Sequence, residues 1–316
     1  MSTTQSLFEG VIVLFLIILI AMVLKRLGIL PKEMSITFSK IVLNVSLPAI
    51  IFTSLALQKF NTDYLKMAAI MAVIELIMIG LAWFIGSLLK LKGPEKGALM
   101  MVSAFGMTSF LGYPIIRQAF PGNPYALQEA VVTSEFGVGL LLFILGPLIA
   151  MHFGSSKVEG KNVFDSLKKF LLSPIFFAII LGIIFSFFPI VHHDFAFNIL
   201  FRTLKYLSHA NLLLVAFTIG LIFEWKPVNS ILLFVGIALV LKLIMKPLLA
   251  YWLMKTPVFT DTMREIVFIE TALPSAILTA VYARQYNCRP DLVSSTIMAG
   301  LIISLGSMSL SFMLFF

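Results

Sequence analysis

Charge is scarce in this chain: 12% of its 316 residues are charged, while 60% are hydrophobic. Soluble domains carry about 25% charged and about 45–50% apolar residues. Half the usual charge on this much apolar surface does not keep a particle dispersed in water. That excludes a cytosolic enzyme, a nucleic-acid-binding protein and a secreted disulfide scaffold. The composition therefore indicates an integral membrane protein.

Cysteine is almost absent. Cys288 stands alone, so no internal disulfide forms, and no Cys or His spacing suggests a metal site. The group His192-His193-Asp194 resembles a metal cluster only superficially, and we interpret it as a solvated outer loop. No Ser-His-Asp ordering, HExxH, GxGxxG or P-loop is present either. We therefore expect no catalytic residues, no metal and no cofactor.

Long apolar runs are abundant instead. A bilayer core about 30 Å thick requires roughly 20 apolar residues per helix. By that measure the chain has ten candidate spans: 8–27, 36–57, 64–89, 97–120, 125–152, 167–189, 197–223, 228–254, 264–286 and 291–315. The first run has no basic residue before it and no small-residue cleavage site after it, so it is predicted to be a span and not a signal peptide. The predicted fold class is an all-α integral membrane protein with ten transmembrane helices.

Lysine and arginine set the predicted orientation. With ten spans, one set of loops holds thirteen basic residues and the other holds six. Because cytoplasmic loops are enriched in Lys and Arg, we expect both termini outside, in a bacterial inner membrane. We interpret the net charge of +8 as Lys and Arg in cytoplasmic loops that lie against anionic membrane lipid, and we expect no nucleic-acid partner.

The chain divides into two predicted halves of five spans each, 1–153 and 167–316, joined by a short cytoplasmic linker at 154–166. An odd number of spans per half turns the second copy over, which gives the inverted repeat of many secondary transporters. The fourth span contains the run Gly106-Met107-Thr108-Ser109-Phe110-Leu111-Gly112-Tyr113-Pro114, and the ninth contains Glu270-Thr271-Ala272-Leu273-Pro274-Ser275. Both have a mid-span proline beside small or hydroxylated residues.

A proline at mid-membrane leaves backbone groups that need protein or a wet cavity to satisfy them. One such proline is more often an ordinary packed kink. Two breaks in matching helices favour a binding site, and half-helix N-termini facing the break suit an anion.

At these residues the sequence resembles the auxin efflux carrier family, the permeases related to the plant PIN-type carriers. The similarity is carried by six stretches: Leu43 to Phe52, Phe110-Leu111-Gly112-Tyr113-Pro114, Lys242 to Pro247, Ala272-Leu273-Pro274-Ser275, Tyr282-Ala283-Arg284-Gln285-Tyr286-Asn287 and Asp291-Leu292-Val293-Ser294-Ser295-Thr296. The resemblance implies a 5+5 inverted repeat in which the fourth and ninth helices cross at their prolines. It also implies elevator-type alternating access and a small organic anion as substrate, such as malate, malonate or an auxin-like acid. A homodimer through the second and seventh helices is implied as well.

The residues expected to bind substrate lie beside this crossover: Asn44, Met107, Thr108, Ser109, Gly112, Pro114, Asn211, Thr271, Pro274 and Ser275. Two of them depart from the family pattern. Met107 stands where the family often has Asn, and Asn211 stands where it often has Pro. Both changes lie near the expected cavity, so the substrate of any one relative does not transfer to this chain.

Ionisable residues inside the spans are functional candidates, because each is costly at mid-bilayer. Glu270, one turn before Pro274, is the first candidate for a proton-coupling group, with a structural carboxylate as the equal alternative. Glu135 is a second candidate for that role. Glu75 and Lys242 occupy matching depths, so a structural salt bridge between them is favoured, with attraction of a substrate carboxylate by Lys242 as the alternative.

Two further basic residues are expected at the membrane boundary. Lys246 lies one turn after Lys242 and is expected to extend toward the interface. Arg117 is expected near the outer end of the fourth span, where an interfacial role is favoured over binding of a carboxylate.

The function predicted from these features is secondary active transport of a small organic anion, coupled to protons or to the membrane potential. One alternative is a sodium-coupled symporter of the bile-acid type. The other is a membrane receptor that binds an anion without moving it. No feature indicates an enzyme.

Overall fold

The computed structural model describes residues 3–154, 168, 171–187, 195–223 and 232–316. Among these described residues the regular elements are helices, joined by turns and short loops, and the one β feature is an isolated antiparallel bridge between Gly106 and Ser275. The predicted all-α fold is therefore confirmed for the described part of the chain. The predicted linker at 154–166 lies outside the described residues except for Gly154, and so does the His192-His193-Asp194 group.

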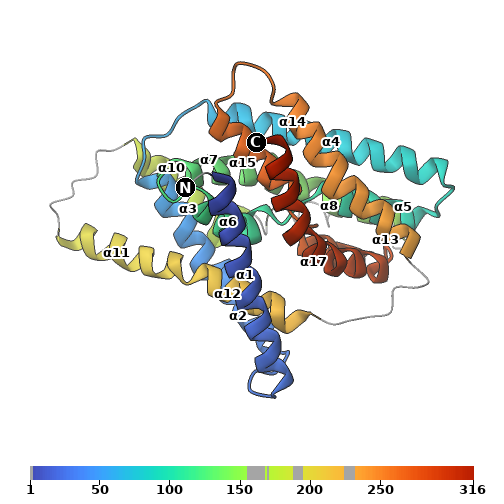
Figure 1. The fold of residues 1–316 in the computed structure, drawn as a ribbon, viewed down its shortest axis with the longest axis horizontal. Helices are drawn as coiled ribbons and strands as arrows, with labels where there is room; N and C mark the ends of the chain where they lie inside the picture. The colour runs from blue at the N-terminus through green and yellow to red at the C-terminus, as the bar shows by residue number, and fades with distance from the viewer. Residues whose placement is uncertain (1–2, 155–167, 169–170, 188–194, 224–231) are drawn as a thin grey trace. The chain divides into compact units, whose positions relative to one another are not determined.

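The helices of the first half follow the predicted spans closely (Figure 1). They are α1 (Thr3–Arg26), α2 (Met34–Ile41), η1 (Val42–Ser46), α3 (Leu47–Ala56), α4 (Tyr64–Leu88), α5 (Gly93–Ala104), η2 (Thr108–Gly112), α6 (Tyr113–Ala119), α7 (Ala126–Val132), η3 (Thr133–Gly139) and α8 (Leu140–Phe153).

In the second half, the first helix whose bounds the structure describes is α10 (Pro174–Ser186), and the helices after it again match predicted spans. They are α11 (Phe195–His209), α12 (Asn211–Ile222), α13 (Leu232–Val240), η4 (Leu241–Met245), α14 (Lys246–Leu253), α15 (Asp261–Ala272), α16 (Ile277–Gln285) and α17 (Pro290–Phe315).

Within the described ranges, seven helical stretches are long and apolar enough to cross a membrane: Thr3–Arg26, Met34–Ala56, Tyr64–Leu88, Ala126–Phe153, Phe197–Ile222, Leu232–Leu253 and Pro290–Phe315. The protein is thus a multi-pass membrane protein. The other three predicted spans hold shorter helices. Two of these spans are interrupted, as α5 with α6 and as α15 with α16, and the third contains α10. Ten spans therefore remain a prediction.

Four of the spans contain a π-helical segment, η1 to η4. A π segment adds one residue to a helical turn, which turns the side chains after it to a new face, and it is frequent at functional sites. Candidate residues lie in all four segments, among them Asn44 in η1, Thr108 in η2, Glu135 in η3 and Lys242 in η4. The residues chosen from sequence therefore coincide with irregular turns.

The expectation that the fourth helix breaks at its proline is wrong. Helix α5 ends at Ala104, whereas Pro114 is the second residue of α6, after the π segment η2. Proline is well tolerated in a first turn, because its missing N–H has no helical partner there. In the ninth helix the break does fall at Pro274, between α15 and α16.

The described chain forms two compact units. Unit 1 comprises 1–62, 109–131 and 169–224, and unit 2 comprises 63–108, 132–168 and 225–316. Each unit takes segments from both predicted halves, so the units are not the two halves of the chain. The division into 1–153 and 167–316 remains a prediction about a repeat.

In unit 1, α1 packs along α12 and also against α6, while α10 packs along α3 (Figure 1). Gly220 permits the close approach of α1 and α12, since a Cβ there would lie 2.6 Å from the Cβ of Ala21. The Nζ of Lys25 donates to the main-chain oxygens of Leu221 (2.9 Å) and Phe223 (2.7 Å) at the end of α12. A lysine at this point satisfies carbonyls that the helix itself leaves free.

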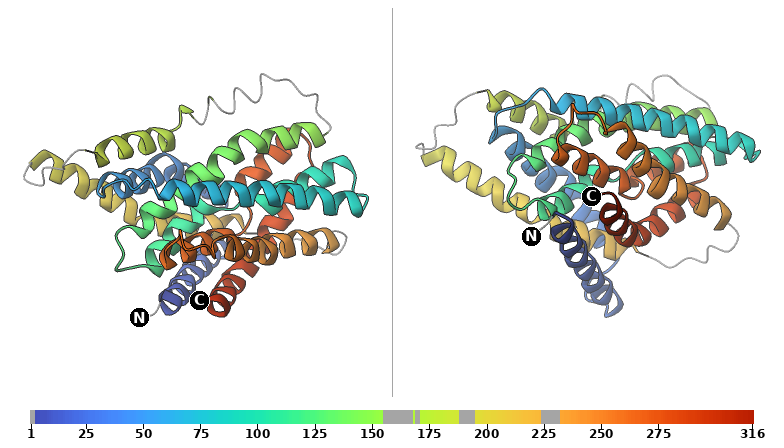
Figure 2. Two further views of the ribbon diagram at one scale, coloured as in Figure 1. Left: turned by 90° about the horizontal axis from the view of Figure 1, so that it is seen from above. Right: turned by 45° about the horizontal axis from the view of Figure 1, so that its top comes forward.

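In unit 2, α4 packs along both α5 and η3, and Figure 2 shows α4 and α5 joined as a hairpin. Gly137 of η3 lies against α4, where a Cβ would be 2.8 Å from both the Ala68 oxygen and the Met71 Cβ. Helices α13, α15 and α16 each pack against α17, and α14 packs against α15. Both interrupted helix ends at residues 104 and 273 belong to this unit.

Candidate functional site: a helix crossover with buried charges

Two short extended segments cross in unit 2. The N–H of Met107 donates to the Pro274 oxygen (2.9 Å), and the N–H of Ala276 donates to the Phe105 oxygen (3.0 Å). The two bonds are reciprocal about the Gly106–Ser275 bridge. Each interrupted helix thereby satisfies backbone groups that the other leaves unpaired, which is the condition for non-helical backbone at membrane depth.

Gly106 lies at the centre of this crossover because a side chain does not fit there. A Cβ at Gly106 would lie 3.1 Å from the Nζ of Lys242 and 3.5 Å from the main-chain oxygen of Glu270. Its backbone is not in the left-handed region. Glycine is therefore required for lack of space, because Lys242 of η4 and the C-terminal end of α15 both lie close to this position.

The C-terminal end of α5 is capped by two lysines. The oxygen of Ala104, the last helical residue, accepts hydrogen bonds from the Nζ atoms of Lys242 (3.0 Å) and Lys246 (2.6 Å). Helix C-termini carry partial negative charge, so two ammonium groups are favourable there. Lys246 also donates to Glu75 Oε1 at 2.6 Å. All three charged side chains are fully buried.

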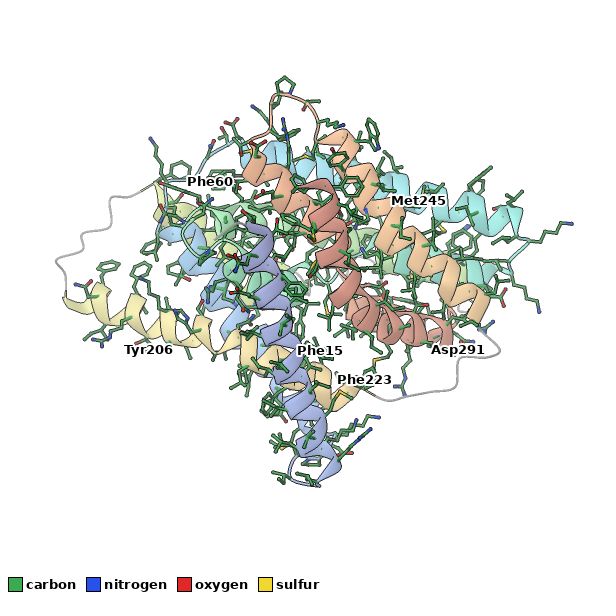
Figure 3. The ribbon with its side chains drawn as sticks, viewed as in Figure 1. Phe15, Phe60, Tyr206, Phe223, Met245 and Asp291 are labelled. Atoms are coloured by element: carbon green, nitrogen blue, oxygen red, sulfur yellow. The ribbon has the colours of Figure 1, made fainter. Side chains whose placement is uncertain are left out.

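The irregular turn η4 directs the two lysines inward. Lys242 and Lys246 are buried, while Met245 between them is 41% exposed and is labelled on the surface in Figure 3. Like charges four residues apart on one helix face repel each other. Here the Ala104 oxygen at the end of α5 and the Glu75 carboxylate of α4 supply the compensating negative charge.

Glu270 carries the one carboxylate of this cluster whose two oxygens both lack a hydrogen-bond partner in the described structure. The side chain is fully buried in the last turn of α15. Glu135, Lys246 and Glu75 act on it electrostatically. A buried carboxyl in this position, at the negative end of a helix, is stable when it is uncharged or when a cation joins it.

Hydroxyl groups complete the polar lining of the crossover. Ser275 donates to the Val102 oxygen (2.6 Å), and the hydroxyls of Thr108 and Ser134 share a hydrogen bond (2.5 Å). Ser103 Oγ is buried with no hydrogen-bond partner in the described structure. A hydroxyl that donates to a main-chain oxygen near the break, as Ser275 does, satisfies a carbonyl group there.

The predicted site residues divide between the two units. Unit 2 holds Met107, Thr108, Thr271, Pro274 and Ser275, together with Glu75, Glu135, Lys242 and Glu270. Unit 1 holds Asn44, Ser109, Gly112, Pro114 and Asn211.

Two of these side chains bond locally, and a third bonds to another helix of unit 1. Thr271 donates to the Phe268 oxygen of its own helix (2.8 Å), and the exposed Asn44 donates to the Lys40 oxygen (2.8 Å). Asn211 is buried and accepts from Ser46 (2.7 Å).

Two expectations about charged residues are wrong. Glu75 forms its salt bridge with Lys246 and not with Lys242, because the extra residue of η4 brings Lys246 toward α4. For the same reason Lys246 does not extend to the interface but is fully buried. The interfacial role of Arg117 stays a prediction; its side chain is half-buried and bonds to Ser208 of α11.

Two features of the structure were not predicted from the sequence. Gly106 is only one member of the fourth-span run, and no local pattern marks the lysine that approaches it. Glu129, in the predicted fifth span, is 6% exposed with its Oε2 unpaired in the described structure. An acidic residue six positions before Glu135 inside an apolar run was a usable signal for it.

The architecture defines a class: a multi-pass helical membrane protein with two interrupted helices that meet at buried charges, as in secondary transporters. The chain belongs to the membrane transport protein family, the family of the auxin efflux carriers, whose model matches residues 6–313. It is thus a membrane transporter.

Relatives are similar over most of the chain. An uncharacterized transporter of Methanocaldococcus jannaschii is 27% identical over 293 residues, 92% of each chain. An uncharacterized transporter of Methanothermobacter thermautotrophicus is 28% identical over 309 residues, 96% of each chain. Auxin efflux carrier component 8 of Arabidopsis thaliana is 23% identical over 252 residues, 65% of this chain and 67% of the plant protein.

Proposed function

We propose that this transporter moves a small organic anion, a carboxylate such as malate, malonate or an auxin-like acid, by elevator-type alternating access. We further propose ten spans in a 5+5 inverted repeat, with both termini outside. The reciprocal bonds at Gly106 and Ser275 support the repeat, since they relate the two interrupted helices by a local two-fold. The equal length of α5 and α15, 12 residues each, agrees with it.

The observation that carries the coupling proposal is the pair of unpaired oxygens on Glu270. Two lysines, Lys242 and Lys246, face three carboxyl groups, those of Glu75, Glu135 and Glu270, in the buried core of unit 2. The set is one positive charge short of neutrality. A proton on Glu270 supplies it at the group that has no partner, and release of that proton is the coupled event.

The anion in this scheme is recognised beside the crossover, where α16 begins at Ile277 and η2 begins at Thr108. Helix N-termini favour negative charge. The two lysines contribute through the field of their charges, because both are already bonded to the end of α5.

The decisive experiment compares Glu270→Gln with Glu9→Gln in proteoliposomes. Glu9 is exposed on α1 and serves as the matched control. Uptake of labelled malonate, malate and indole-3-acetate is measured with a pH gradient, a sodium gradient or neither. We expect Glu270→Gln to abolish or uncouple pH-driven uptake and Glu9→Gln to leave it unchanged; equal uptake by the two variants would remove Glu270 from the mechanism.

The same vesicles separate the alternatives. Uptake driven by sodium and not by the pH gradient would indicate a sodium symporter, in which a cation joins Glu270. A receptor binds the anion but does not exchange it, so absence of counterflow by the unmodified protein would overturn transport of these anions.

A further inference from the structure

In unit 1, we propose that Arg117, Ser208 and Asn211 form a second binding site, for a carboxylate group, where α11 meets α12. The inference rests on the proposed function only for the kind of ligand. All three residues belong to unit 1, including Asn211, which was expected beside the crossover, whereas the crossover itself lies in unit 2.

Arg117 is a half-buried cation without an anionic partner. Its two terminal nitrogens donate to one residue, Ser208, at the main-chain oxygen (3.2 Å) and at Oγ (2.7 Å). Among the described residues no carboxylate lies within ion-pair distance of it. A guanidinium has five N–H donors in a planar fork, so donors remain for a ligand.

Asn211 is a buried donor without an acceptor. The residue is 1% exposed, and its Oδ1 accepts a hydrogen bond from Ser46 Oγ at 2.7 Å. Its Nδ2 has no partner in the described structure. A buried N–H group without a hydrogen-bond acceptor destabilises the folded protein, so a ligand that supplies an acceptor at this position is stabilising.

The two donors lie at the junction of α11 and α12. Ser208, to which Arg117 is bonded, is in the last turn of α11, and Asn211, three residues later, is the first residue of α12 after the turn residue Ala210. Ser208 and Asn211 are both 1% exposed, so both face the interior of unit 1. The guanidinium is bonded to Ser208, and the free amide belongs to the residue three positions further on, so both donors belong to this junction.

The charge around this junction is positive. Arg117 and Lys205 both act electrostatically on His209, which is exposed at the edge of the site. A cation would be repelled there. A carboxylate fits, because one oxygen can accept from the guanidinium and the other from the amide. A purely structural role for Arg117 accounts for its bonds to Ser208 but not for the unmet Nδ2 of Asn211.

The test uses protection from alkylation. His209→Cys places a thiol at the edge of the site, Arg202→Cys on the same helix is the exposed control, and the buried native Cys288 gives the background. Acetate, malonate, malate and indole-3-acetate are each added to purified full-length protein before a hydrophilic maleimide. We expect at least one anion to slow modification at position 209 by about tenfold and leave position 202 unchanged.

Adding Arg117→Gln or the isosteric Asn211→Asp should remove this protection, while the native Cys288 stays unmodified as the sign that the protein remains folded. The proposal is overturned if none of the four anions protects position 209, or if protection survives both substitutions. A Glu270→Gln background should keep the protection. Protection without any transport would leave this site standing while refuting the proposed function.

Discussion

The Nζ of Lys246 lies 2.6 Å from Oε1 of Glu75, and neither side chain is exposed to any degree. The same nitrogen bonds to the oxygen of Ala104 at 2.6 Å. One ammonium group thus joins α14, α4 and the interrupted end of α5. Its loss leaves a buried carboxylate unpaired and removes one of the two lysines that cap α5, which separates this ion pair energetically from those at the surface of unit 2.

Removing one partner of this pair should destabilise the protein more than removing both. Lys246→Met leaves Glu75 charged and buried, which costs about 3–5 kcal/mol, whereas replacing both partners by uncharged groups costs less. We expect the thermal unfolding midpoint in detergent to fall strongly for Lys246→Met and to recover in part in Glu75→Gln/Lys246→Met. A double variant as unstable as the single one would show that the Ala104 contact, and not the ion pair, dominates.

An ion pair at the edge of unit 2 gives the opposite expectation. Arg289 bonds to Glu95 (2.6 Å) and Asp291 (2.7 Å), but its side chain is 35% exposed. Solvent-exposed pairs contribute roughly 0.2–1 kcal/mol and are weakened by salt. Arg289→Gln should therefore lower stability by no more than about 1 kcal/mol, with a smaller effect in high salt. A loss as large as that of Lys246→Met would contradict this interpretation.

Gly106→Ala should impair transport more than folding. The added Cβ would lie 3.1 Å from Lys242 Nζ, so the ammonium must shift from the end of α5. Small overpacking of this kind costs about 1–3 kcal/mol. We expect a folded protein with several-fold slower malonate exchange, measured in proteoliposomes.

The matched control is Gly80→Ala on α4, where nothing lies within 4 Å of the added Cβ. Exchange by this variant should equal that of the unmodified protein. If Gly80→Ala slows exchange as much as Gly106→Ala, the contact with Lys242 is not the reason.

Cys288 should be inert in the folded protein. Its side chain is buried in the turn between α16 and α17, and burial raises the pKa of the thiol to about 12. Because the thiolate is the reactive form, a raised pKa suppresses alkylation at every pH below that value. We expect no maleimide labelling from pH 7 to pH 9 and full labelling in denaturing detergent. Rapid labelling of the folded protein at pH 7 would show that this turn opens.

Much of the fold follows from the sequence. Apolar runs of about 20 residues require helices, since backbone groups in hydrocarbon must be satisfied within their own segment. That reasoning located every helical segment the structure describes. It misplaced the break in the fourth helix, because a proline is visible in sequence, whereas the actual break at residues 105–107 depends on hydrogen bonds to residues 274 and 276.

The sequence by itself thus determined a multi-pass helical membrane protein, its family, and which ionisable residues lie within the spans. Only the tertiary structure decided that Lys246 pairs with Glu75, that Gly106 must be small, and that Glu270 has both oxygens unpaired. The physical reason is that hydropathy and helix length are properties of one segment. The partner of a buried charge depends on helical turns, including π segments, and on helix ends that come from distant parts of the chain.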